Sequence, residues 1–204
     1  MKNILLTSYF AGTIRQFKQF MANQSTEITN ILFIDTASKV EEYTGYIDEA
    51  YKALLNLNYT IDTLDISNSD KIKSKNQIQN ADTIFIAGGN TFYLLDKLKS
   101  QKLDKLLIDK INTGTPYIGE SAGAIILSPD ITYIQELDDA SFAPNLNTYT
   151  GLGITDFSIL PHYLDKPFEN EASTIFNKYH DKLDLITLNN QETISILNDR
   201  LILN

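Results

Sequence analysis

The chain has 204 residues, a formal net charge of −9 and no cysteine. The negative charge argues against a nucleic-acid binder and against a protein that adheres to an anionic membrane surface. The lack of cysteine excludes disulfides, thiolate catalysis and cysteine-ligated metals. No stretch reaches the roughly 20 apolar residues of a membrane helix, and the N-terminal apolar run is too short for a signal peptide. We therefore expect one cytoplasmic domain over residues 1–204.

The first part of the chain alternates between two hydrophobic patterns. Short apolar runs predict strands at 3–7, 30–35, 60–64 and 83–87. Helical spacing of apolar residues predicts helices at 14–21, 40–57, 91–98 and 103–111. The polar stretch 67–80 is expected to carry a short surface helix. This alternation predicts the α/β class with a three-layer, open and mostly parallel sheet of the flavodoxin-like type.

The hydrophobic pattern becomes less regular in the second part of the chain. A strand at 116–119 precedes a tight turn, and residues 129–153 are polar and turn-rich, which predicts loops. We expect a helix at 171–179 and strands at 154–161, 183–188, 193–197 and 200–203. The last two strands form a hairpin about Asn198-Asp199, whose apolar surface is a candidate for pairing two copies into a homodimer.

The turn at Gly119-Glu120-Ser121-Ala122-Gly123 fits G-x-S-x-G, the nucleophile elbow of serine hydrolases. A serine in a sharp strand-to-helix turn projects its hydroxyl away from the sheet, and small neighbours let the backbone pass close by. Alone the motif is weak, but its place between a buried strand and a helix strengthens it. In open α/β sheets the site lies beyond the carboxyl ends of the strands, where Ser121 falls.

A serine nucleophile needs a base, usually a histidine. The chain has only His162, which follows an apolar strand, and His180, which lies at a charged helix end. A lone histidine is more often structural or solvated than catalytic. Paired with an elbow serine, His162 is the better candidate for the base.

A second turn, Gly88-Gly89-Asn90, also follows a buried strand. Glycine lets a backbone amide approach a substrate, so an amide from Gly88-Gly89 and the Ala122 amide are candidate oxyanion donors. The plain alternative is a tight turn in which Asn90 or Thr91 caps the next helix. Both interpretations can hold together.

The acid that would orient the histidine stays open. The candidates are carboxylates before and after His162, each of which is individually more often a solvated surface group: Glu136, Asp138, Asp139 and Glu192. Glu120, inside the elbow, is expected to point away from the serine and is a weaker candidate.

Three segments, 87–95, 117–124 and 160–163, together resemble peptidase E and its relatives, the aspartyl dipeptidases and cyanophycinases. Those proteins are serine hydrolases with a fold similar to class I glutamine amidotransferases. The resemblance runs from about Asn3 to Leu197 and occurs in the family's order and spacing.

The resemblance implies Ser121 as nucleophile, His162 as base, and the amides of Gly89 and Ala122 as oxyanion donors. It also implies that Gly88 and Asn90 shape the substrate pocket. For the acid it points to Glu136 or to the loop of Asn190 and Glu192; we favour Glu192, and an Asn190 in that position would leave a dyad.

The resemblance also implies a small peptide substrate. An aspartate side chain calls for a cation, ideally an arginine, but Lys166 is the only cation close after His162. We therefore expect a dipeptidase or small-peptide hydrolase without strict preference for an N-terminal aspartate. The alternatives are an esterase or amidase on a non-peptide substrate and a non-catalytic ligand-binding module. We expect no metal and no cofactor.

Overall fold

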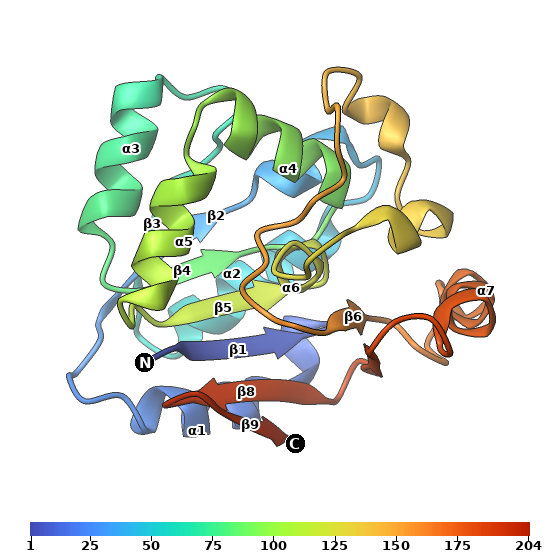
Figure 1. The fold of residues 1–204 in the computed structure, drawn as a ribbon. Coiled ribbons are helices and arrows are strands. Elements are labelled where there is room, and N and C mark those ends of the chain that lie inside the picture. The colour runs from blue at the N-terminus through green and yellow to red at the C-terminus, as the bar shows by residue number, and fades with distance from the viewer.

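This computed structural model describes residues 1–204, which are built around a seven-stranded sheet of order β3-β2-β4-β5-β1-β8-β9 (Figure 1). The strands of this sheet are β1 (Asn3–Thr7), β2 (Asn30–Ile34), β3 (Thr60–Leu64), β4 (Ile84–Ile86), β5 (Tyr117–Glu120), β8 (Thr193–Leu197) and β9 (Arg200–Leu203). Strands β1 to β5 pair in parallel, whereas β8 and β9 are antiparallel additions next to β1. The predicted α/β class with an open, mostly parallel sheet is confirmed.

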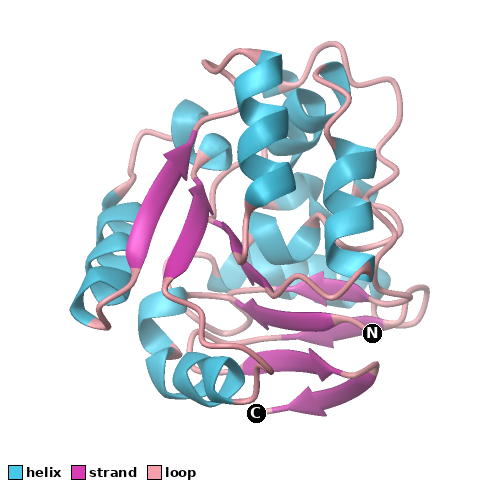
Figure 2. Cartoon of the chain, turned by 90° about the vertical axis from the view of Figure 1, so that its left-hand side faces the viewer, coloured by secondary structure: helices cyan, strands magenta, loops and turns pink.

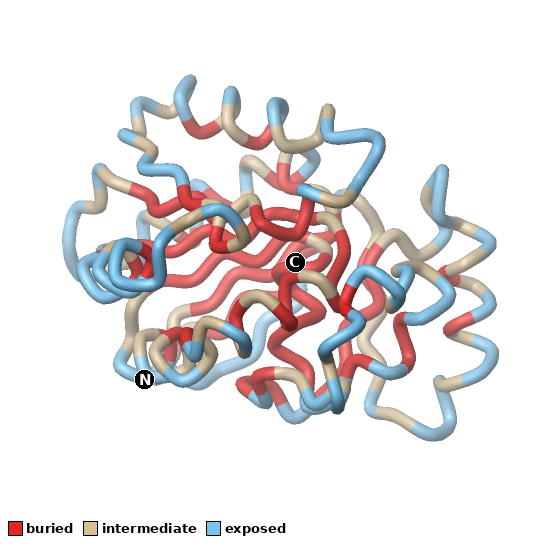
Figure 3. Tube along the Cα trace, turned by 90° about the horizontal axis from the view of Figure 1, so that it is seen from above, coloured by how far each residue is buried: buried red, intermediate tan, exposed pale blue.

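Helices cover both faces of the sheet (Figure 2). They are α1 (Ile14–Ala22), α2 (Gly45–Asn56), α3 (Lys71–Asn80), α4 (Thr91–Ser100), α5 (Asp104–Asn112), α6 (Ala122–Ile125) and α7 (Glu169–Tyr179). Buried residues of α1 and α2 share one apolar cluster with one side of the strands, and those of α3 to α7 share the other. Seen from above, buried strands run between helices whose outer sides are exposed (Figure 3). None of the helices combines the length and the hydropathy needed to cross a bilayer.

Burial of the strands follows from their place in the sheet. In β1 the side chains alternate, so that Leu5 joins the cluster under α1 and α2 while Ile4 and Leu6 join the opposite cluster. Central strands buried on both faces read as continuous apolar runs, which is why β1, β2 and β4 were recognisable in the sequence. The edge strand β9 is exposed along its whole length.

The prediction of one helix over 40–57 was too long at its start. The chain forms a 3₁₀ turn over Thr36–Val40, and α2 begins only at Gly45. The turn is held by the Ser38 hydroxyl, which donates to the Asp35 carbonyl at 2.8 Å. The Asn90 amide donates to the Ala37 carbonyl at 2.9 Å, so a contact distant in sequence also holds this turn.

The second part of the chain contains less regular structure than its apolar runs indicated. The expected strands at 154–161 and 183–188 shorten to β6 (Ser158–Leu160) and β7 (Leu185–Thr187), which form a parallel pair separate from the main sheet. The segment 129–153 holds the 3₁₀ turns Thr132–Glu136 and Ala140–Phe142 and one isolated bridge between Asp130 and Thr150, and is otherwise the loop that its composition predicted. Figure 1 shows β6 lying beyond the arrowheads of β1 and β5, and the loop after β6 carries His162.

The C-terminal hairpin forms where the sequence placed it. Asn198 and Asp199 both have positive φ, 51° and 63°, as the two central residues of a type I′ turn require. The exposed side chains of Leu201, Ile202 and Leu203 lie on β9, at one edge of the sheet.

Candidate active site

Ser121 occupies a strained turn between β5 and α6. Its φ of 46° and ψ of −104° lie outside the regions that serine normally adopts, which costs on the order of 1–3 kcal/mol. The Ser121 amide donates to the Thr7 carbonyl at 2.9 Å, and its carbonyl accepts from Ala124 and Ile125, so the backbone is held on both sides. The geometry is that of a nucleophile elbow.

The glycines of the elbow are required by close backbone contacts. A Cβ on Gly123 would lie 2.2 Å from the Ile86 carbonyl oxygen on the neighbouring strand β4. A Cβ on Gly119 would lie 2.5 Å from the Gly123 carbonyl oxygen. The spacing of the motif thus follows from the packing of the turn against the sheet.

His162 meets the elbow from the loop after β6. Its Nε2 lies 3.0 Å from the Ser121 hydroxyl, and its ring lies against Phe168 at 4.9 Å between ring centroids. His162 has a positive φ of 59°, and the next amide, of Tyr163, donates to the Leu188 carbonyl at the end of β7. Burial lowers the pKa of His162 against the raising effects of Asn190 and Asp165. A neutral imidazole at this position can accept the hydroxyl proton of Ser121.

The second ring nitrogen of His162 faces two neutral side chains. Nδ1 lies 3.0 Å from the amide oxygen Oδ1 of Asn190 and 3.0 Å from the hydroxyl of Ser8. The Ser8 hydroxyl also donates to Asn190 Oδ1 at 2.7 Å. An asparagine, not a carboxylate, therefore contacts the imidazole on the side away from Ser121.

The two carboxylates expected to orient the base bind elsewhere. Glu192 accepts from the Asn189 amide at 2.9 Å, within its own loop. Glu136 forms an exposed ion pair with Lys178 at 3.2 Å. The structure does not bring either of them into hydrogen-bond contact with His162.

A carboxylate not expected from the sequence, that of Asp165, contacts Asn190, the neighbour of His162. Asp165 accepts from the backbone amide of Asn190 at 2.5 Å, and its charge raises the pKa of His162. Ser8 was also overlooked. Its place just after β1, the strand next to β5, could have indicated it, because carboxyl ends of neighbouring parallel strands lie together.

The Gly88-Gly89 turn lies beside the elbow. A Cβ on Gly88 would lie 3.4 Å from Cβ of Ser121, so this residue is in contact distance of the serine. Gly89 has a φ of 128°, and a Cβ there would lie 2.3 Å from the Ala37 carbonyl carbon. Neither the Gly89 nor the Ala122 amide donates a hydrogen bond to a protein group, which leaves both donors free. Free amides beside a serine hydroxyl can hold a developing oxyanion.

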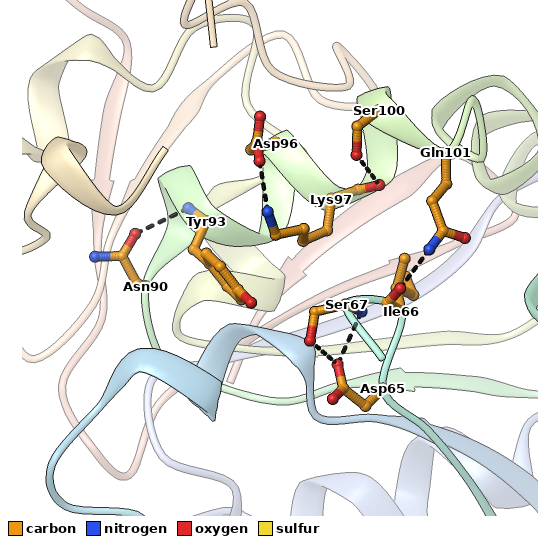
Figure 4. A network of polar contacts seen from close by, with 9 residues as sticks. All are labelled: Asp65, Ile66, Ser67, Asn90, Tyr93, Asp96, Lys97, Ser100 and Gln101. Carbon is orange, nitrogen blue, oxygen red and sulfur yellow. Dashed lines mark hydrogen bonds and ion pairs between the residues drawn. The ribbon is translucent and has the colours of Figure 1, made fainter. Parts of the chain in front are cut away.

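Asn90 performs the capping role that was the plain alternative. Its Oδ1 accepts from the Tyr93 amide at 2.9 Å at the start of α4, as Figure 4 shows. Its Nδ2 donates to the Asp139 carbonyl at 3.0 Å, and the residue is buried. At the other end of α4, Gln101 donates to the Ile66 carbonyl (Figure 4), so the helix behind the glycine turn is held at both ends.

The remaining candidate side chains, Lys166 and His180, make no hydrogen bond to Ser121 or His162. Lys166 is exposed on the loop after His162. His180, at the end of α7, is paired with Asp181 at 3.2 Å and exposed, as expected of a solvated helix-end histidine. No group of three or more histidine, aspartate or glutamate side chains is arranged to hold a metal ion.

One buried carboxyl group, that of Glu120, and one half-buried group, that of Asp138, lie at the carboxyl end of the sheet. Glu120 accepts from the Phe10 amide at 2.8 Å, and Asp138 accepts from the Thr91 amide at 2.8 Å. Burial raises the pKa of each to about 7, against the opposing effect of these hydrogen bonds. Tyr46, whose ring would contact a Cβ on Gly88, has a buried hydroxyl without a partner.

Two cavities of the chain lie away from the serine. One of about 610 Å³ is lined by residues before β2 and β3, including Lys18, Met21 and Tyr59. It lies at the amino ends of the strands, opposite to where sheets of this type bind ligands. Another of about 420 Å³ lies behind the imidazole and is lined by Asp165 and Asn190 among others.

Comparison with known proteins points to one family of peptidases. Residues 4–204 match the model of peptidase family S51. The chain is 41% identical to the uncharacterized peptidase Lmo0363 of Listeria monocytogenes, over 96% of this chain and 95% of that one. It is 30% identical to a peptidase E of Nostoc, over 76% of this chain and 60% of that protein.

The fold is also that of a solved relative. A crystal structure of a candidate peptidase E from Listeria monocytogenes superposes with a TM-score of 0.93 at 39% identity, over 100% of this chain and 98% of that one. The similarity therefore covers the whole sheet, the elbow and the His162 loop. The chain belongs to peptidase family S51 and is a serine-type peptidase.

Proposed function

We propose that the chain is a single-domain hydrolase of dipeptides or other small peptides that uses Ser121 as nucleophile and His162 as base. The observation that carries this proposal is the 3.0 Å contact between the Ser121 hydroxyl and Nε2 of His162 on a strained elbow. The free amides of Gly89 and Ala122 at the same strand ends support it.

The reaction follows from these positions. His162 takes the hydroxyl proton of Ser121 as the oxygen attacks the peptide carbonyl, and the amides of Gly89 and Ala122 hold the oxyanion. The imidazolium gives its proton to the leaving amine, which leaves an acyl-serine. Water then repeats the sequence in reverse, with His162 again as base, and releases the acid.

The substrate class is supported by the relatives named as peptidases, among them peptidase E. Strict recognition of an N-terminal aspartate would call for a bidentate cation, and no arginine lies between residues 163 and 172. We therefore propose a broader preference among dipeptides, with Lys166 as the one nearby cation for an acidic side chain.

The test is labelling with a fluorophosphonate, followed by mass spectrometry of the labelled peptide. We expect one label, at Ser121, in the wild type and none in Ser121→Ala. His162→Ala should slow labelling by roughly 10²–10⁴-fold, the range of a general base. Labelling at another residue, or equal labelling of His162→Ala, would overturn the proposed roles.

A panel of dipeptides with varied N-terminal residues then tests the substrate. We expect hydrolysis of several members, lost in Ser121→Ala. An activated serine that hydrolyses small acyl esters but no dipeptide would replace the peptide proposal with an esterase. An unreactive serine with no hydrolysis would favour a ligand-binding module.

A further inference from the structure

Ser8 lies directly behind the imidazole of His162. It follows β1, whose Thr7 pairs with Glu120 of β5, so Ser8 is the neighbour of Ser121 across the two strand ends. The residue is only 1% exposed. Its hydroxyl oxygen accepts from the His162 backbone amide at 2.8 Å, lies 2.7 Å from Asn190 Oδ1, and lies 3.0 Å from His162 Nδ1.

The hydrogens of this cluster can be assigned from its chemistry. The His162 backbone amide is a fixed donor, so it occupies one lone pair of the Ser8 oxygen. Asn190 Oδ1 has no hydrogen, so the contact at 2.7 Å requires the Ser8 hydroxyl to donate. Nδ1 of His162 then faces two oxygens whose free positions are lone pairs, and it must itself carry a hydrogen.

A hydrogen on Nδ1 leaves Nε2 of a neutral imidazole as an acceptor. Nε2 is the nitrogen that faces the Ser121 hydroxyl at 3.0 Å. The opposite tautomer would place a hydrogen between Nε2 and Ser121 and could not take the serine proton. The choice of tautomer thus depends on whether the Asn190 side chain turns its oxygen or its nitrogen toward Nδ1. The Ser8 hydroxyl donates to the oxygen and so favours the orientation in which the oxygen faces Nδ1.

The segments that carry Ser8 and Asn190 are fixed by further contacts. The Phe10 amide donates to Glu120 at 2.8 Å, and the Thr13 hydroxyl donates to the Phe10 carbonyl at 3.1 Å. Asn190 is held by its own amide on Asp165. Orienting groups that are themselves fixed lose little entropy when they hold a ring in place.

We propose that Ser8 is a positioning residue which fixes the Asn190 amide and, through it, the Nδ1–H tautomer of His162. This inference rests on the proposed hydrolase function. Ser8 and Asn190 form a neutral pair in the place of a carboxylate. During acylation the Ser121 proton moves to Nε2, while the hydrogen on Nδ1 keeps its hydrogen bond to Asn190 Oδ1. The proton on Nε2 later leaves with the amine.

The first test needs no activity. In ¹⁵N-labelled protein only His162 and His180 give imidazole signals, and His180→Gln assigns them. We expect the neutral His162 of the wild type to be protonated at Nδ1. A neutral ring protonated at Nε2 would overturn the inference, whatever the labelling experiment shows for Ser121.

The second test uses Ser8→Ala with Ser195→Ala as the matched control. Ser195 is a buried serine of β8 whose hydroxyl accepts from the Asn204 side chain at 3.3 Å, apart from the His162 cluster. We expect Ser8→Ala to populate both tautomers and to lower kcat by roughly 10- to 100-fold with KM nearly unchanged. Ser195→Ala should keep both properties of the wild type. A Ser8→Ala variant with unchanged tautomer and kcat would overturn the inference.

Rescue separates positioning from a general structural role. A carboxylate presents two equivalent acceptors to Nδ1, so it needs no neighbour to choose between them. We expect Asn190→Asp in the Ser8→Ala background to restore the Nδ1–H tautomer and to recover kcat by roughly 10-fold. A double variant as slow as Ser8→Ala, with the tautomers still mixed, would contradict the positioning role.

Discussion

Asn190 Oδ1 lies 3.0 Å from Nδ1 of His162, an uncharged oxygen at the position where many serine hydrolases carry a carboxylate. In the proposed mechanism the imidazolium of His162 would therefore form without a contacting counter-charge. Asp165 does not contact the ring: it accepts from the Asn190 backbone amide and acts on His162 through its charge alone. A base without an adjacent carboxylate keeps a low pKa, and burial of His162 acts in the same direction.

Asn190→Asp should raise the pKa of His162, because a carboxylate next to Nδ1 stabilises the charged imidazolium. Since the neutral imidazole is the active form in the proposed mechanism, the acid limb of the kcat/KM profile should move to higher pH, by about one unit or more. The check is to measure the pH profile of dipeptide hydrolysis for the wild type, for Asn190→Asp and for the control variant Glu192→Gln. The Glu192 variant should leave the limb in place, because Glu192 binds the Asn189 amide. An unmoved limb in Asn190→Asp would contradict this account of the base.

Gly89→Ala should destabilise the chain strongly. Its φ of 128° disfavours any side chain, and the new Cβ would lie 2.3 Å from the Ala37 carbonyl carbon, which must then move. We expect a loss of roughly 2–4 kcal/mol in the free energy of unfolding and a large loss of activity. Gly153→Ala is the matched control, since Gly153 has a φ of 60° but nothing within 4 Å of its Cβ. It should cost about 1 kcal/mol. Equal losses in urea unfolding would show that contact with Ala37 is not the cause.

Ser121→Gly should stabilise the fold while abolishing hydrolysis. The φ of 46° and ψ of −104° strain a serine, and glycine tolerates positive φ without steric cost. We expect a gain of about 1 kcal/mol in the free energy of unfolding, after the entropy loss of glycine in the unfolded chain. Ser121→Ala should be equally inactive without that gain, because the strain remains. Thermal unfolding of both variants makes the comparison, and a less stable Ser121→Gly would argue against strain at the elbow.

Glu120→Gln should flatten the pH dependence of stability near neutrality. Burial raises the pKa of Glu120 from its usual 4.5 to about 7. Below pH 4.5 the group is protonated in both states, and between 4.5 and 7 only the unfolded chain loses the proton. The free energy of unfolding should therefore fall by about 3 kcal/mol as pH rises through this window, then level off above 7.

Urea unfolding from pH 4.5 to 8 measures this effect as a difference between wild type and Glu120→Gln, which cancels the other carboxylates. Asp138→Asn offers a parallel case, because burial raises the pKa of Asp138 from 3.8 to about 7. The Asp139→Asn control should not show the same decline, since hydrogen bonds from Ser141 lower the pKa of that exposed carboxylate. A wild-type curve parallel to that of Glu120→Gln would contradict a raised pKa.

Local chemistry made much of this protein predictable from its sequence. Apolar runs and helical spacing depend on residues within a few turns of each other, so β1, β3 and the helices α1, α4 and α5 could be placed closely. Turn chemistry is local too, which is why the Ser121 elbow, the Gly88-Gly89 turn and the Asn198-Asp199 hairpin were recognisable. The small number of histidines left His162 as the natural partner of Ser121.

The tertiary structure decided what stands behind the imidazole. Ser8 and His162 are 154 positions apart, and Asn190 is 28 positions beyond His162, so no sequence period connects them. The sequence favoured Glu192 among several loop carboxylates and left Asn190 as an alternative; packing selected the Asn190 amide, with the Ser8 hydroxyl beside it. The 3₁₀ turn before α2 is likewise held by a distant contact, between the Ala37 carbonyl and the Asn90 amide. Sequence by itself thus determined the strands of the main sheet, the turns and the candidate pair of Ser121 and His162. The juxtaposition of distant strand ends, which depends on the packed sheet, determined how that pair is held.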